Sequence, residues 1–126
     1  GAVTTSDYNT AVGRNAGAGV TTGANNTFIG GLAGDATDDG ADCVAVGYLA
    51  LSANCEGANT AVGSNSLSQA SGSSNTAIGY FTMGESEVSG DHNTSCGYAA
   101  GYFWDQTQDA QEVRAVMLLQ AVMLSV

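Results

Sequence analysis

A five-residue motif recurs six times along this chain of 126 residues and constrains its fold more than any other feature. The commonest form is Asn-Thr-Ala-Val-Gly, and each copy closes on a glycine, at positions 13, 30, 47, 63, 79 and 97. Successive glycines are 17, 17, 16, 16 and 18 residues apart. A short and nearly constant period is typical of one small structural unit stacked on copies of itself.

Within each copy the side chains alternate in kind, as they do along a β-strand. The residues three before and one before the glycine are nearly all Thr, Val or Ile, and the residue between them is mostly Ala. Because successive strand side chains point to opposite faces, one face is β-branched and the other is small. We expect both faces to be buried, with another backbone close to the Ala face. The residue after the glycine varies freely and is expected to point outward; it is Arg14, Gly31, Tyr48, Ser64, Tyr80 or Tyr98.

A second segment of small residues follows each glycine, and a polar, Gly-rich turn then leads to the next copy. Two short strands and two bends suit a coil of this length, whereas an α/α repeat needs a longer period. We therefore predict an all-β fold, a repetitive parallel β-solenoid (β-roll) of about six coils of 16–18 residues. Residues 1–104 are expected to form the β-solenoid repeat domain, and residues 105–126 a C-terminal apolar oligomerisation segment.

The residues that open and close the motif are expected to hold the coils together. Stacked asparagine side chains can hydrogen-bond along a ladder and satisfy turn amides. The closing glycine can supply a positive φ at a corner or permit close approach of another backbone. The residues assigned to the structural repeat are Asn9, Val12, Gly13, Asn26, Ile29, Gly30, Val46, Gly47, Asn59, Val62, Gly63, Asn75, Ile78, Gly79, Asn93 and Gly97.

The repeated motif, joined by a Gly-rich turn as in residues 21–27, resembles the repeats of phage tail fibres and related bacterial surface proteins. It is also similar to the head repeats of trimeric autotransporter adhesins, whose related Val-Ala-Ile-Gly motif builds a left-handed parallel β-roll from three chains. The resemblance covers residues 9 to about 101. It implies a homotrimeric rod in which packing around a common axis buries the Ala face and the Val/Ile face together.

The C-terminal segment breaks the pattern, because apolar residues recur there at helical spacings of three and four. The candidate oligomerisation residues are Val113, Val116, Met117, Met123 and Leu124. A short apolar helix that forms a trimeric neck or coiled coil is one interpretation; a strand donated to the next subunit is the other, and would make the protein a polymer. The apolar run from 115 to 126 falls far short of the ~20 residues that span a bilayer.

The charge of the chain bears on its partners and its location. Twelve acidic residues and two arginines give a formal net charge of −10, and lysine is absent. A polyanion repels phosphate backbones and anionic lipids, so neither nucleic acid binding nor membrane insertion is expected. High negative charge favours solubility, and we expect an extracellular or virion-surface location. No signal-peptide pattern is visible, and because the chain starts at Gly1 we expect a processed product or a piece of a longer protein.

An acidic turn is the candidate metal site of the sequence, although a weak one. It contains Asp35, Asp38, Asp39 and Asp42. Carboxylate oxygens are the ligands that Ca²⁺ prefers, but the spacing matches neither an EF-hand nor the calcium-binding nonapeptide. We therefore expect a solvated acidic loop, and no metal or other cofactor.

The sequence assigns no catalytic residue. His92 lies beside Asp91 in a turn, but the period places no nucleophile near it, and the chain has no nucleophile elbow, phosphate loop or HExxH. A disulfide between Cys43 and Cys55 can form within one coil, yet separate thiols are the simpler interpretation. Cys96 occupies the Val/Ile position of its repeat and is expected to be a small buried hydrophobic residue.

Together these patterns predict a structural protein and no enzyme. The leading hypothesis is the rod of a virion tail fibre or cell-surface adhesin fibre, which gives rigid extension and attachment. Its partners would be further copies of itself and a host cell-surface glycan or receptor. The first alternative is the subunit of a self-polymerising extracellular filament, joined through the C-terminal segment. The second is an ice- or surface-binding solenoid, which requires a flat and exposed threonine array.

Overall fold

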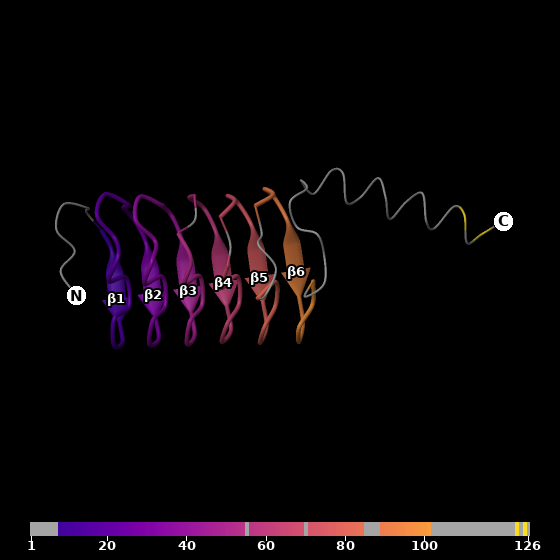
Figure 1. The fold of residues 1–126 in the computed structure, drawn as a ribbon, viewed down its shortest axis with the longest axis horizontal. Coiled ribbons are helices and arrows are strands. Elements are labelled where there is room, and N and C mark those ends of the chain that lie inside the picture. Colours follow the sequence, from indigo (N-terminus) through magenta and orange to yellow (C-terminus); the bar gives the residue numbers. More distant parts are fainter. Residues whose placement is uncertain are drawn as a thin grey trace.

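The computed structural model describes residues 8–54, 56–69, 71–84 and 89–101, together with Met123 and Ser125. These residues form six short strands: β1 (Thr10–Val12), β2 (Thr27–Ile29), β3 (Val44–Val46), β4 (Thr60–Val62), β5 (Thr76–Ile78) and β6 (Thr94–Cys96). The strands make one parallel sheet in sequence order, β1-β2-β3-β4-β5-β6, so each coil of the chain adds one strand (Figure 1). The prediction of an all-β parallel solenoid is confirmed.

The six copies of the motif stack in register. Ala45 pairs with Ala61, and Val46 pairs with Val62, in the parallel ladder between β3 and β4. The same positions pair in every other neighbouring pair of strands. Each copy of the sequence motif therefore marks one strand.

The segment after each closing glycine is not a second strand, contrary to the expectation of two strands per coil. It is a series of turns, and the residues two and four after the glycine have a positive φ, as at Asn65 (57°) and Leu67 (47°). Backbone hydrogen bonds between coils still hold it, for example from Leu51 N to Ser66 O at 2.9 Å. Left-handed residues cannot continue a strand, because they turn the chain away from the extended direction.

The two faces of the sheet differ in burial within the single chain. The middle residue of each strand points into the coil, where Ala45, Ala61 and Ala77 are fully buried. The β-branched residues face outward, and in the single chain Val12 is 58% and Ile78 43% exposed. The small face is buried because the turn segment of the same chain packs against it. No second chain is needed to cover the Ala face.

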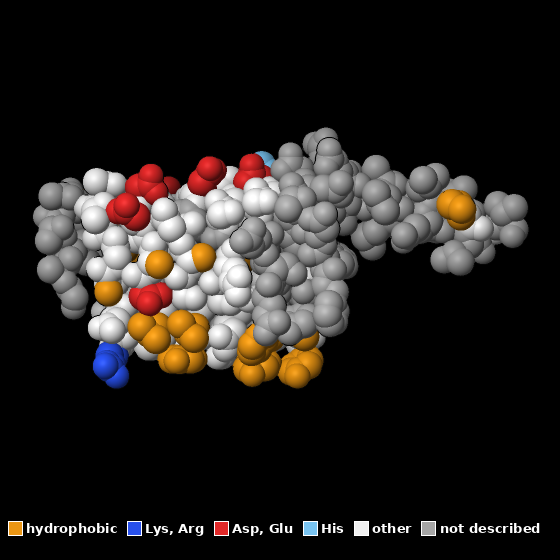
Figure 2. Space-filling view, in the orientation of Figure 1, with side chains coloured by type: hydrophobic (Ala, Val, Ile, Leu, Met, Phe, Trp, Pro, Cys, Tyr) orange, Lys and Arg blue, Asp and Glu red, His pale blue; other side chains and the backbone are white. Residues whose placement is uncertain are grey.

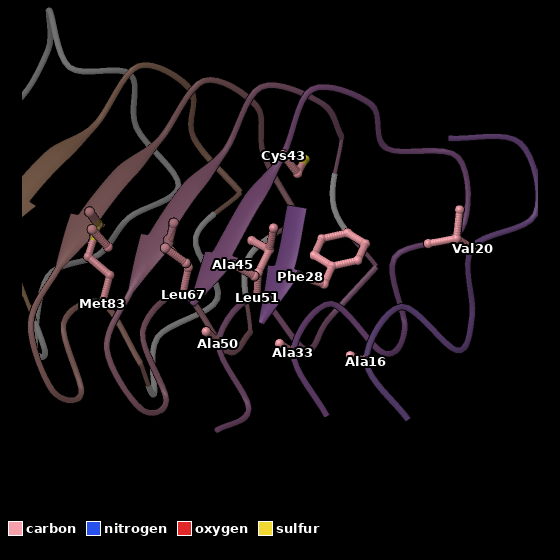
Figure 3. Close-up of a cluster of buried hydrophobic side chains, with 12 residues drawn as sticks. Ala16, Val20, Phe28, Ala33, Cys43, Ala45, Ala50, Leu51, Leu67 and Met83 are labelled. Carbon is pink, nitrogen blue, oxygen red and sulfur yellow. The ribbon is translucent and has the colours of Figure 1, made fainter. Parts of the chain in front are cut away.

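The core consists of strand residues and turn residues whose sizes compensate. Where β3, β4 and β5 carry Ala, the buried residue four after the glycine is large, namely Leu51, Leu67 or Met83. These three side chains and the ring of Phe28 follow one another along the interior of the coils (Figure 3). In β2 the order of sizes is reversed, since Phe28 replaces Ala and Gly34 replaces the large residue. The second to fifth coils thus each contribute one large side chain from these two positions to a narrow interior.

Most of the C-terminal segment lies outside the described residues, and so do the predicted oligomerisation residues Val113, Val116, Met117 and Leu124. Of that set, Met123 is described, and its side chain is exposed. In the part of the chain that the structure describes, no helix has both the length and the hydropathy to cross a membrane.

Candidate functional site and binding surfaces

The opening asparagines form the predicted ladder along the rod. Asn59 Oδ1 accepts from the backbone N of Asn75 at 2.9 Å, and Asn75 Oδ1 accepts from the backbone N of Asn93 at 2.9 Å. The amide group of Asn75 also donates to Gly90 O at 2.9 Å, in the turn of the following coil. Asn9 and Asn26 make equivalent bonds in the first coils. Asn9, Asn26, Asn59 and Asn75 therefore each join their coil to the next through one acceptor and one donor. The ladder is interrupted at the third copy, where Cys43 replaces the asparagine.

We expect Asn75→Ala to lower the free energy of unfolding by about 2–4 kcal/mol, because it leaves two buried backbone groups without partners. Asn75 is fully buried, and its side chain satisfies Asn93 N and Gly90 O. The measurement is urea unfolding followed by circular dichroism. The control is Asn54→Ala, which removes an exposed amide that accepts a single bond from Asp38 N and should change stability by under about 1 kcal/mol. Equal losses in the two variants would contradict a structural role for the ladder.

The first five closing glycines combine a positive φ with close backbone approach, the two roles that the sequence suggested for this position. Gly30 and Gly47 both have φ +132°. A Cβ added at Gly30 would lie 2.6 Å from Gly47 O, and one added at Gly47 would lie 2.7 Å from the carbonyl carbon of Gly63. Two independent constraints therefore require glycine at this corner.

The outward face of the sheet carries two continuous rows of uncharged side chains along the rod. One row holds Thr10, Thr27, Val44, Thr60, Thr76 and Thr94, and the other holds Val12, Ile29, Val46, Val62, Ile78 and Cys96. All twelve are partly or fully exposed in the single chain. Cys96 is among the exposed residues, so the prediction that it is buried is wrong; its position faces away from the core. The rows give the molecule an extended uncharged face, in which a row made mostly of threonine lies beside an apolar row.

The corner after each closing glycine presents a further row of side chains, called here the corner row. The expectation that this position points outward is confirmed for three tyrosines. The exposed fractions are 53% for Tyr48, 49% for Tyr80 and 81% for Tyr98. The rings of Tyr80 and Tyr98 stack, with centroids 5.7 Å apart and planes 17° from parallel. Arg14 occupies the same position in the first coil and is exposed. A shallow notch of about 240 Å³ separates Arg14 from Tyr48, and Asn15, Gly31 and Leu32 complete its lining.

The acidic residues do not converge on a metal site. Asp38 accepts from Thr21 Oγ1, and Asp42 accepts from Asn25 Nδ2 at 3.1 Å, so each bonds to the preceding coil. Within the described ranges, no three His, Cys, Asp or Glu side chains are placed to hold a metal ion. Asp35 Oδ1 is covered and has no hydrogen-bond partner, and burial raises the pKa of this carboxyl group. Asp39 is exposed.

The remaining candidates are distributed over the surface and the core. His92 is exposed, and its backbone N donates to Ser73 O at 3.1 Å. Asp91 Oδ1 accepts from Ser73 N and Oγ at 2.7 and 3.0 Å, and these hydrogen bonds lower the pKa of Asp91. Cys43 is buried, and Cys55 lies outside the described residues. The notch beside Gly31 was not predicted from the sequence. The available signal was that Gly31 is the one residue without a side chain at the position after the closing glycine.

Comparison of this chain with protein-family models, with curated proteins and with solved structures finds no match. Any assignment of function therefore rests on the residues and surfaces described above.

Proposed function

We propose that this chain is a non-enzymatic structural rod, of the kind that forms a virion tail fibre or a cell-surface adhesin fibre. Six coils at a strand spacing of about 4.8 Å extend the chain by roughly 29 Å. Backbone bonds join the neighbouring coils, and the opening asparagine side chains add bonds except after the third copy, which opens with Cys43. Because every coil is bonded to the next, the stack resists bending along the axis of the rod. The repeats that this motif resembles belong to fibres of that kind.

The observation that carries the proposal is the exposed β-branched face. It runs over all six strands, and its two rows contain no charged side chain. A continuous uncharged surface that includes a row of exposed apolar side chains is typical of a protein interface. We assign it to further copies of the same chain, because three identical faces turned toward one axis would bury one another along the whole length of the rod. The acidic turns then remain in solvent.

The expected mass in solution is three times the 12.5 kDa of one chain. Val62→Asp should give a monomer with its coils intact, because a carboxylate in the middle of the apolar face cannot be buried without a partner. The matched control is Ser64→Asp, two residues along the chain at the outward corner, which should remain trimeric. Light scattering measures the mass, and circular dichroism reports the fold. A monomeric wild-type chain would refute the trimer.

A mass above that of a trimer, which grows with concentration and is lost on deletion of residues 108–126, would instead indicate the polymeric filament.

Exposure of the threonine row also favours a second candidate, a solenoid that binds an ice surface. Thr60 and Thr76 are neighbours in register on the partly exposed face, one strand spacing apart. Ice binding and the trimer exclude each other, because chains that cover this face with one another cannot present it to ice. Thermal hysteresis from a monomeric protein would support ice binding, and its absence would remove this candidate.

A further inference from the structure

The corner row that follows the closing glycines is held rigidly. Leu32 N donates to Arg14 O at 2.9 Å, and Asn65 N donates to Tyr48 O at 2.9 Å. In both cases a hydrogen bond from the following coil holds the backbone of the outward residue. The donors Leu32 and Asn65 have positive φ values of 59° and 57°, which turn the chain sharply after the outward residue. The side chains therefore project from one corner, one strand spacing apart.

Gly31 interrupts this row, and the backbone does not require a glycine there. Gly31 lacks the positive φ of the closing glycines, and a Cβ added to it would meet Tyr48 Cδ2 at 3.6 Å, an ordinary contact. The row itself shows that neighbouring tyrosines fit, since Tyr80 and Tyr98 stack in adjacent coils. The glycine leaves the notch between Arg14 and Tyr48 open. Neither backbone conformation nor packing therefore explains why a glycine occupies position 31.

The lining of the notch defines the ligand that it suits. Arg14 contributes a guanidinium group, which binds a carboxylate through two parallel hydrogen bonds. Tyr48 contributes an aromatic ring, whose electron-rich face attracts the weakly positive C–H groups of a sugar ring. Asn15 adds an amide that can bond to hydroxyl groups. The volume of about 240 Å³ is below the about 300–1,000 Å³ of pockets for drug-sized ligands, which suits one pyranose ring.

The charge distribution permits a small anion at this corner despite the net charge of −10. On the face seen in Figure 2, most carboxylates lie along the upper edge, and the arginine lies at the lower edge beside the exposed apolar side chains. Salt at physiological strength screens exposed charges beyond about 8 Å. Long anionic polymers remain disfavoured by the summed charge, whereas one carboxylate can pair with one guanidinium.

We propose that the notch binds a carboxylated pyranose, such as the sialic acid or uronic acid unit of a surface glycan. The carboxylate pairs with Arg14, and the C–H face of the ring packs on Tyr48 in the space left by Gly31. This inference rests on the proposed function in one respect, because it supplies a ligand for the attachment role of the fibre. The site itself is formed by residues of one chain.

The test is titration of the full chain with three methyl glycosides, those of N-acetylneuraminic acid, glucuronic acid and glucose, monitored by saturation-transfer NMR. At least one acidic glycoside should bind at least ten-fold more tightly than the glucoside. Arg14→Gln should reduce that affinity about ten-fold and leave the response to glucoside unchanged. Equal binding of neutral and acidic sugars, or no effect of Arg14→Gln, would overturn the proposal.

Two filling variants provide the matched pair. Gly31→Tyr restores a tyrosine to the row and should abolish binding, while Ser64→Tyr fills the next gap along the same corner and should leave binding intact. Both are expected to keep the thermal midpoint and the mass of the wild type. If the Gly31→Tyr variant still binds the acidic glycoside, the notch is not the binding site. A trimeric wild-type protein that binds none of the sugars refutes this inference alone, and a monomer that binds refutes the trimer alone.

Discussion

Gly47→Ala is expected to lower the free energy of unfolding by about 3–5 kcal/mol, a large share of the 5–15 kcal/mol that stabilises a typical domain. Two effects add. Gly47 has φ +132°, where any other residue is strained, and a Cβ there would lie 2.7 to 2.9 Å from backbone atoms of Gly63 and Ser64. Because these contacts are all with backbone, no side chain can move aside. Urea unfolding at fixed protein concentration measures the loss.

Gly97→Ala separates the two effects. Gly97 closes the last copy of the motif with φ +125°, but among the described residues the nearest atom to an added Cβ is Ala100 Cβ at 3.8 Å. This variant carries the conformational strain without the collision, so we expect a loss of about 1–2 kcal/mol. The difference between the two variants measures the cost of moving one coil away from the next. Equal losses would mean that backbone approach plays no part.

The ladder residues were predictable from the sequence because their roles are local and repeated. An asparagine or glycine at a fixed phase of a short period must face its own copies in the neighbouring coils, and Asn59, Asn75 and Asn93 do so. The glycine was predicted for a positive φ or for close approach, and Gly47 shows both. Periodicity alone was sufficient for these assignments, and it also gave the parallel register.

The orientation of the sheet faces could not be predicted in the same way. Alternation along Thr60-Ala61-Val62 shows that two faces differ, and burial of the larger residues is the usual expectation. Here the coil is too narrow for β-branched residues on the strand, because the turn segment already supplies Leu67. The sizes on both sides of the coil must be considered together to see that Ala61 points inward.

The left-handed turns were missed for a different reason. Leu51 and Met83 have φ values of +52° and +50°, which isolated leucine or methionine rarely adopts. Stacking overrides that preference, since Met83 N bonds to Ala100 O and its side chain is fully buried. A weaker signal was present just before three copies of the motif, where Asn25, Asp42 and His92 have positive φ and belong to residue types that tolerate it.

The exchange of sizes in β2 leads to the second large effect. Phe28→Ala should lower the free energy of unfolding by about 3–5 kcal/mol, because it removes a large and fully buried side chain from the core. Gly34→Leu alone should also destabilise, since its Cβ would lie 2.5 Å from the Phe28 ring. The double variant should be more stable than Phe28→Ala, because it reproduces the pairing of Ala45 with Leu51. A double-mutant cycle in urea measures this coupling, and simple additivity of the two losses would contradict it.

The double variant should recover only part of the stability that Phe28→Ala loses. The Phe28 ring also extends toward the preceding coil, where a Cβ at Gly17 would lie 2.9 Å from it. In later coils Leu51 or Leu67 fills that position, so the coil of Phe28 fits after the first coil and would collide with the others. Near-identical motifs invite slippage of register. The double variant should therefore regain stability at the expense of this specificity.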